Sequence, residues 1–155
     1  MKFVTREKVK VDRVACPWVI RRFVDPKAVF LFVPAASVLE VARREGAIAF
    51  DAPGAELNHR TVGGEERVTF DAVIERYGLT DPALLDLAEI VRGADARLSR
   101  PRPESAGLAA LATGFRRTTP TDEESLRLQF PVYDALYAYC QERVGAGASR
   151  SAPAP

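Results

Sequence analysis

The 155-residue sequence is poor in the residues from which small metal and disulfide sites are usually built. It contains two cysteines, Cys16 and Cys140, and one histidine, His59. Two cysteines so far apart exclude a disulfide scaffold and a CxxC zinc or redox motif. A site built on several histidines is also excluded, unless a second subunit supplies the others. Histidine chemistry within one chain therefore depends on His59.

Long apolar segments are absent as well. No run approaches the ~20 apolar residues that cross a bilayer, so the sequence predicts no membrane association. Residues 1–12 carry several charges and lack the apolar core of a signal peptide. We therefore expect a cytoplasmic protein whose thiols are reduced.

Neither sign of charge is in excess. The chain has 22 Lys and Arg residues against 21 Asp and Glu residues, a formal net charge of +1. This balance argues against nucleic-acid binding through a global positive field, although a local basic patch is compatible with it. Of the 22 basic residues, 18 are arginine. The arginine excess fits oxyanion recognition by planar guanidinium groups, and it equally fits the codon usage of a GC-rich genome.

The overall composition is that of an ordinary globular protein. Hydrophobic residues make up 47% of the sequence and charged residues 28%, which is typical of a soluble domain. The length suits one domain rather than two. We predict a single domain over residues 1–144, followed by a flexible tail over 145–155 that is rich in small residues and proline.

Strands and helices alternate in the predicted structure of the N-terminal third. Alternating valines and lysines predict a strand over 8–11, and Cys16 precedes a proline that suits the first turn of a helix. A β-branched and aromatic run predicts a strand over 28–33, a helix should occupy 37–46, and a third strand 47–50. This βαβαβ order predicts a small, mostly parallel sheet.

The rest of the chain has helical periodicity. A hairpin is expected around Gly63 and Gly64. Apolar spacings of three and four predict the helices that follow, with Gly93 as the end of one of them. Pro131 should kink the last helix or mark its true start. The predicted fold class is therefore α/β, with the sheet in the N-terminal third packed by a helical C-terminal half.

Polar residues follow each predicted strand. Because ligands bind beyond the carboxyl ends of parallel strands, we expect these three loops to converge on a site. In chain order the loops carry Asp12, Arg13 and Cys16; residues 34–36; and Asp51, Glu56 and His59.

The third loop contains the candidate metal ligands. Glu56 and His59 are three residues apart and Asp51 lies just upstream. Carboxylate and imidazole groups bind divalent transition metals such as zinc, iron or manganese. Two other interpretations stay open, a structural hydrogen bond between His59 and a carboxylate, and a catalytic dyad in which His59 moves a substrate proton.

Cys16 is the second catalytic candidate. At a helix N-terminus the peptide dipoles lower the pKa of a thiol, so Cys16 would be a reactive nucleophile or redox group that faces the same pocket. The alternative is a buried cysteine that acts as a small apolar residue.

Three arginines are candidates for binding an anion. Arg21 and Arg22 belong to the first predicted helix, and Arg92 lies near the end of a later one. At least two of them should converge on the pocket as an oxyanion clamp. Arg92 would alternatively complement a helix dipole. Tyr133 and Tyr137 are expected in the core, although their helix could form a homodimer interface.

Several segments together resemble the chromate-resistance domain found at the C-terminus of ChrB proteins. The longest is VDRVACPWVIRRFVDPKAVFLFV, and the similarity covers about residues 8–142. The segments that carry it are 11–33, 50–59, 69–72, 81–84, 90–95, 106–108 and 133–140.

The resemblance implies a role in chromate resistance. Longer relatives carry an N-terminal region associated with control of the chromate operon, so we do not expect this chain alone to act by binding DNA. Our first hypothesis is an oxyanion- or metal-responsive binding domain of the chromate stress response. The alternatives are a metal- or thiol-dependent enzyme, reductive or hydrolytic, that uses Cys16 or a Glu56/His59 site, and an interaction module.

Overall fold

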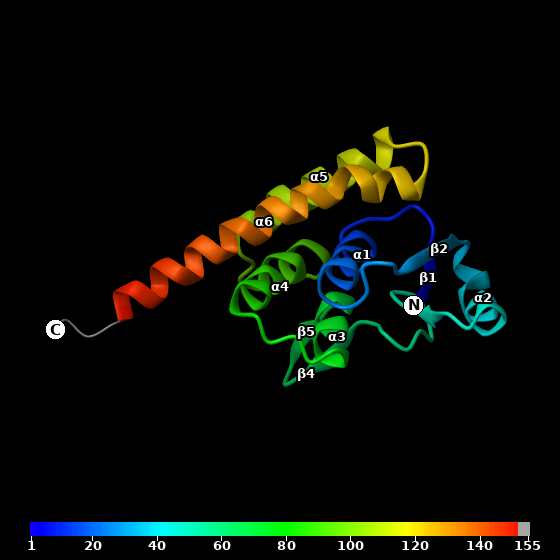
Figure 1. Ribbon diagram of the computed structural model, residues 1–155, viewed down its shortest axis with the longest axis horizontal. Coiled ribbons are helices and arrows are strands. Elements are labelled where there is room, and N and C mark those ends of the chain that lie inside the picture. The colour runs from blue at the N-terminus through cyan, green and yellow to red at the C-terminus, as the bar shows by residue number, and fades with distance from the viewer. Residues whose placement is uncertain (152–155) are drawn as a thin grey trace.

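The computed structural model describes residues 1–151 and has an α/β fold (Figure 1). Strands and helices alternate in the N-terminal third, a short hairpin follows, and four helices complete the chain. The elements are β1 Lys2–Arg6, α1 Asp12–Phe23, β2 Val29–Val33, η1 Ala35–Ser37, α2 Val38–Glu45, β3 Ile48–Ala49, β4 Arg60–Val62, β5 Glu65–Arg67, α3 Thr69–Arg76, α4 Pro82–Asp95, α5 Pro103–Thr118 and α6 Asp122–Ser151.

The main sheet has the predicted parallel βαβαβ topology. Its strand order is β2-β1-β3, and β1 pairs in parallel with both neighbours. Phe3 of β1 lies opposite Phe30 on one side and Ile48 on the other. The carboxyl ends of β1 and β3 therefore lie at one edge of the sheet, where the polar loops begin.

The first strand is not where the sequence pattern placed it. The strand predicted over 8–11 is wrong, because β1 spans Lys2–Arg6. The later segment turns instead, with positive φ angles at Lys8 and Val11. Asp122 of α6 accepts hydrogen bonds from the backbone of Lys8 and Val9. The apolar alternation at 8–11 thus reflects a buried turn, and no local pattern distinguishes that from a buried strand.

Each face of the sheet packs against a different part of the chain. On one face Phe3, Phe30 and Phe50 form ring contacts with centroids 5.5–6.4 Å apart. On the other face a smaller cluster includes Val4, and Val38 and Val41 of α2. The strands are covered on both faces, as expected for a parallel sheet.

The helical half covers α1 and the C-terminal part of α6 extends beyond the body of the molecule (Figure 1). Trp18 of α1 contacts the rings of Tyr133 and Tyr137 from α6 at 6.0 and 5.9 Å. Tyr133 is fully buried, which confirms its predicted place in the core. Its hydroxyl donates a hydrogen bond to the carbonyl of Val11. The last helix therefore supports the turn that precedes α1.

Two predicted helix boundaries differ in the structure, one at Gly93 and one at the C-terminal tail. Helix α4 passes through Gly93 and ends at Asp95. Gly93 is needed for close packing rather than for termination, because an added Cβ would lie 2.4 Å from Oγ of Ser105. Helix α6 begins at Asp122 and includes Pro131. It continues to Ser151, so the predicted tail is helical over 145–151, while 152–155 lie outside the described residues.

The predicted hairpin is confirmed, and the start of α4 is capped. Gly63 and Gly64, with φ of 60° and 82°, form a two-residue turn between β4 and β5. Asp81 caps α4 by accepting a hydrogen bond from the backbone of Leu84. The first feature fixes the hairpin that carries Glu66, and the second fixes the start of α4, whose other end is Asp95.

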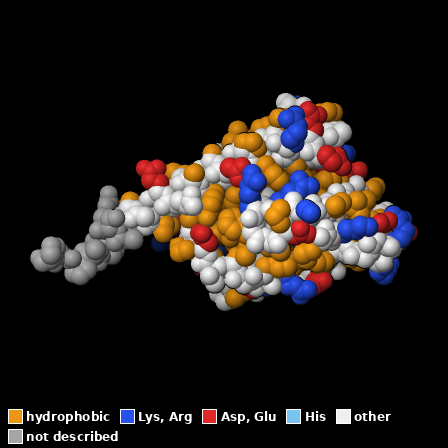
Figure 2. Space-filling view, viewed as in Figure 1, with side chains coloured by type: hydrophobic (Ala, Val, Ile, Leu, Met, Phe, Trp, Pro, Cys, Tyr) orange, Lys and Arg blue, Asp and Glu red, His pale blue; other side chains and the backbone are white. Residues whose placement is uncertain are grey.

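On the face shown in Figure 2, basic and acidic side chains are interspersed, in keeping with the balanced composition. Within residues 1–151, none of the helices combines the length and the apolar character that a membrane span requires.

Candidate metal centre

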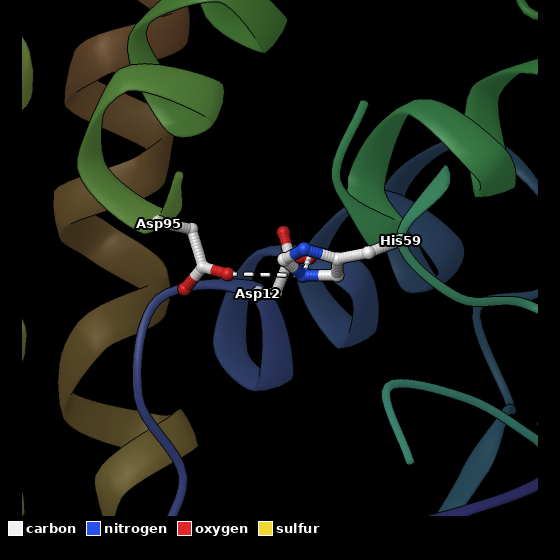
Figure 3. Close-up of side chains that lie close together, drawn as sticks. All are labelled: Asp12, His59 and Asp95. Atoms are coloured by element: carbon white, nitrogen blue, oxygen red, sulfur yellow. Dashed lines mark ion pairs between the residues drawn. The ribbon is translucent and has the colours of Figure 1, made fainter. Parts of the chain in front are cut away.

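A cluster of carboxylates surrounds the imidazole of His59. Its Nε2 atom lies 3.2 Å from Oδ2 of Asp12, 3.1 Å from Oδ2 of Asp95 and 3.6 Å from Oδ1 of Asp51. Figure 3 shows Asp12 and Asp95 approaching the ring from α1 and from the end of α4. Asp12, His59 and Asp95 each offer a ligand atom, and these atoms lie within 4.8 Å of one another.

Asp12 is held in place at the N-termini of two helices, α1 and α3. It is the first residue of α1 and is fully buried. Its carboxylate also accepts hydrogen bonds from the backbone N–H groups of Thr69 (2.6 Å) and Phe70 (3.4 Å) at the start of α3. Val11, just before it, has φ of 34°, a strained conformation for a β-branched residue. Such strain is often concentrated at functional sites.

Asp51 follows β3 and is held by two arginines. Its φ of 45° turns the chain at the sheet edge. Arg6 donates hydrogen bonds to its carbonyl (2.8 Å) and to its carboxylate (3.2 Å), and Nε of Arg13 lies 3.6 Å from Oδ2. The hydroxyl of Thr69 reaches Oδ1 at 3.3 Å. The segments that follow β1 and β3 thus converge as predicted, whereas residues 34–36, the other predicted loop, make no hydrogen bond or ion pair with this cluster in the described part of the chain.

Glu66 contacts the other side of the imidazole. Its Oε1 atom lies 3.2 Å from Nδ1 of His59. A histidine that ligates a metal commonly donates its second N–H to a carboxylate, which fixes the tautomer and the ring orientation. The β4–β5 hairpin positions Glu66, since Thr61 and Glu66 are paired in its register.

The pKa values in the cluster are shifted because several carboxylates lie close together in a partly buried site. Hydrogen bonds to Asp12 and then Asp95 raise the pKa of His59. Burial raises the pKa of Asp12, and the charges of Asp95 and Asp51 add to that increase. His59 is therefore the cationic group at the centre that these carboxylates share, and Arg6 and Arg13 also pair with Asp51.

Two distances within the cluster are compatible with a small divalent ion as well as with hydrogen bonds. Two donors about 2.1 Å from one metal lie about 3.0–3.4 Å apart in octahedral or tetrahedral geometry. The distances from Nε2 of His59 to Asp12 and Asp95 fall in this range. One imidazole with two or three carboxylates is a donor set that suits manganese, iron or zinc.

Of the metal ligands expected from sequence, Glu56 takes a different partner. Its carboxylate pairs with Arg76 at 3.0 Å and is half exposed. Asp51 and His59 do lie together. Spacing alone missed Asp12 and Asp95, which belong to helices far from His59 in the sequence. Both lie in segments that carried the family resemblance, and that was the available signal.

Cys16 is not at a helix start, so that prediction is wrong. Helix α1 begins at Asp12, and Cys16 is completely buried in its interior. Burial raises the pKa of its thiol well above the ordinary value, and the charge of Asp12 acts in the same direction. This environment favours the neutral thiol and matches the alternative of a small buried core residue.

Arg21 and Arg22 line a hollow of about 350 Å³ between α1, β2 and α6. The guanidinium of Arg21 lies over the rings of Phe30 and Phe130, 5.1 and 5.8 Å from their centroids, and its Nε donates to the carbonyl of Ala28. These contacts integrate Arg21 into the packing of the fold. His59 is not among the residues that line this hollow.

The other two candidate arginines are each paired with an aspartate. Arg22 donates two hydrogen bonds to Asp134, at 2.9 and 2.6 Å. Arg92 donates two to Asp71, at 3.0 and 2.8 Å. Two of the three arginines, Arg21 and Arg22, therefore share a hollow, but His59 and Cys16 do not line it, and Arg92 lies apart on α4.

Comparison with known proteins assigns the family. Residues 3–140 match the model described as ChrB, C-terminal domain. The chain belongs to the ChrB C-terminal domain family. This confirms the resemblance seen in the sequence and identifies the chain as a ChrB-type domain.

One curated ChrB relative extends well beyond this domain. The chain is 36% identical over 141 residues to Protein ChrB of Cupriavidus metallidurans (strain CH34). The alignment covers 89% of this chain and 40% of that protein, so the chain spans less than half the length of this relative. No solved structure shows a significant match.

Proposed function

We propose that this ChrB-type domain binds one divalent transition-metal ion, with Asp12, His59 and Asp95 as ligands and Asp51 beside them. The observation that carries the proposal is the placement of three carboxylates around Nε2 of His59 while Nδ1 contacts a fourth. Manganese, iron and zinc are the candidate ions.

A surrounding shell of hydrogen bonds supports this assignment. Asp12 is oriented by backbone N–H groups of α3, and Glu66 holds the second imidazole nitrogen. Ligands that are held this way lose little conformational entropy on binding a metal.

Metal binding would join parts of the chain that are distant in sequence. The ligands come from the start of α1, the loop before β4 and the end of α4. An ion that bridges them stabilises the folded state by linkage, because the unfolded chain does not hold the ligands together. The domain would then be metal-responsive, with the helical half and the sheet edge tied together when the ion is present.

Three protein ligands would leave coordination positions for water or a small molecule. A bound ion can act there as a Lewis acid. His59 and Asp95 retain 29% and 21% of their side-chain exposure, so the centre is accessible from solvent. This accessibility is what a responsive or catalytic centre requires, and a buried structural ion would not need it.

The test is a metal titration of protein stripped with a chelator. We expect manganese, ferrous iron under anaerobic conditions, or zinc to bind with a stoichiometry of one by calorimetry and to raise the melting temperature. His59→Gln should abolish both effects. Glu56→Gln is the matched control, since Glu56 lies in the same loop but pairs with Arg76. Absence of binding by the wild type, or equal binding by His59→Gln, would reject the proposal.

A further inference from the structure

A second polar hollow lies beside the candidate metal centre. Its volume is about 510 Å³, within the range of sites for small organic ligands. The walls come from the β4–β5 hairpin, from α4 and from the connection between α4 and α5. Glu66, which contacts His59, belongs to the hairpin wall.

The connection between α4 and α5 contributes most of the basic residues. Arg97, Arg100 and Arg102 line the hollow together with Leu98 and Ser99. The first of these arginines follows the proposed ligand Asp95 by two positions. The same short segment therefore borders both the metal centre and the hollow.

Most charges around the hollow are already paired. Arg102 contacts Asp86, Glu89 and Glu104. Likewise, Arg92 is paired with Asp71 and Glu65 with Arg67, while Glu66 contacts His59.

The remaining charge is positive. Arg97 and Arg100 are exposed, and neither forms an ion pair with another residue in the described part of the chain. Two unpaired guanidinium groups on one wall of a hollow attract an anion and can bind it through paired N–H donors.

We propose that this hollow binds a small organic molecule bearing a phosphate or carboxylate group, which Arg97 and Arg100 hold. A volume of about 510 Å³ leaves room for an organic portion beyond the anionic group, and Leu98 supplies an apolar contact. Ser99 adds a hydroxyl group to the same wall. The place of this ligand as a neighbour of a bound ion rests on the proposed function, whereas the anion site itself does not.

The test uses two simple probes, inorganic phosphate and malonate, titrated by calorimetry into chelator-treated protein and into the same protein with metal added. We expect millimolar or tighter binding of at least one probe. The better probe identifies the anionic group. Arg97→Gln/Arg100→Gln should weaken this binding at least tenfold. Arg117→Gln, which changes an exposed arginine outside the hollow, should leave it unchanged.

The outcomes separate this proposal from the metal site. Anion binding that is lost in the double variant, in protein that takes up no metal, would support the hollow and reject the metal centre. Metal binding without binding of either probe at 10 mM would do the reverse. Anion binding that is equal in the wild type and the double variant would overturn the assignment to Arg97 and Arg100.

Discussion

Two groups of charged side chains in this domain contrast in how their carboxylates are neutralised. In the Arg102 cluster, Asp86 accepts hydrogen bonds from Arg102 at 2.8 Å and from Arg143 at 3.1 and 3.2 Å. In the His59 cluster, Asp12 and Asp95 meet at a single imidazole. One cluster relies on guanidinium groups that are always charged, and the other on a ring that can exchange its proton for a metal.

The pKa values of Asp86 and Asp12 shift in opposite directions in the two clusters. Burial acts to raise the pKa of Asp86, but hydrogen bonds from Arg143 and Arg102 lower it to about 2. The pKa of Asp12 is raised, because burial and neighbouring aspartates outweigh the contact with His59. Asp86 is thus satisfied by the protein itself. Asp12 instead shares one imidazole cation with neighbouring carboxylates, and this arrangement is the basis of the proposed metal site.

The largest expected effect concerns a ligand of the His59 cluster. Asp95→Asn keeps the shape of the side chain and removes its charge. We expect metal affinity to fall at least 100-fold, about 2.7 kcal/mol. The metal-free variant should lose less than about 1 kcal/mol of stability, because Asp95 is partly exposed. Calorimetry and urea unfolding measure the two quantities, and an unchanged metal affinity would remove Asp95 from the site.

The Arg102 cluster should show the opposite pattern. Arg102→Met removes the cation that contacts Asp86, Glu89 and Glu104 but keeps much of the apolar stem. We expect a loss of about 2 kcal/mol in the free energy of unfolding, the size of a charge-assisted hydrogen bond. Metal affinity should stay within twofold of the wild type. A variant as stable as the wild type would show that this cluster contributes little to the fold.

Acid should remove part of the stability supplied by the Arg102 cluster. The pKa of Asp86 is about 2 in the folded protein against an ordinary value of 3.8. Because the folded pKa is the lower one, the carboxylate stabilises the fold above about pH 4, and this contribution is lost as the pH falls toward 2.

Asp86→Asn measures this contribution. We expect the variant to be about 1 kcal/mol less stable than the wild type at pH 7, allowing for partial exposure of the cluster. The difference should shrink between pH 4 and pH 2 in unfolding experiments. A difference that is independent of pH would assign the effect to packing instead of charge.

The smallest expected effect concerns Glu56, which lies in the same loop as His59 but outside the proposed set of ligands. Glu56 was the ligand that spacing suggested, yet its carboxylate pairs with the exposed side chain of Arg76. Glu56→Gln should change metal affinity by less than twofold and stability by less than about 1 kcal/mol. A large loss of metal affinity would restore Glu56 as a ligand.

Local patterns predicted the sheet topology, the hairpin and most helices, because apolar periodicity and turn residues act over a few positions. They placed the first strand at 8–11 instead of Lys2–Arg6, because Val9 and Val11 are buried in a turn whose backbone is held by residues of α6, which the local sequence does not reveal. Likewise, Gly93 suggested a helix end, whereas its packing against Ser105 keeps α4 intact.

The topology of the sheet predicted only part of the site. The rule that loops converge at the carboxyl ends of parallel strands brought Asp12, Asp51 and His59 together, as the structure confirms. Asp95 could not be found this way, because it comes from the end of α4 and depends on how the helical half packs against the sheet. Tertiary packing brings Asp95 to His59, and such packing produces no short-range spacing pattern in the sequence.

The most direct test of the metal centre uses the single histidine of the chain. A long-range nitrogen–proton NMR spectrum resolves Nδ1 and Nε2 of His59 without any assignment problem. We expect one equivalent of zinc to shift the Nε2 signal as it becomes a ligand, while Nδ1 keeps its proton toward Glu66. Asp95→Asn should need far more zinc for the same change. Signals of both nitrogens that stay unchanged in excess zinc would contradict the account.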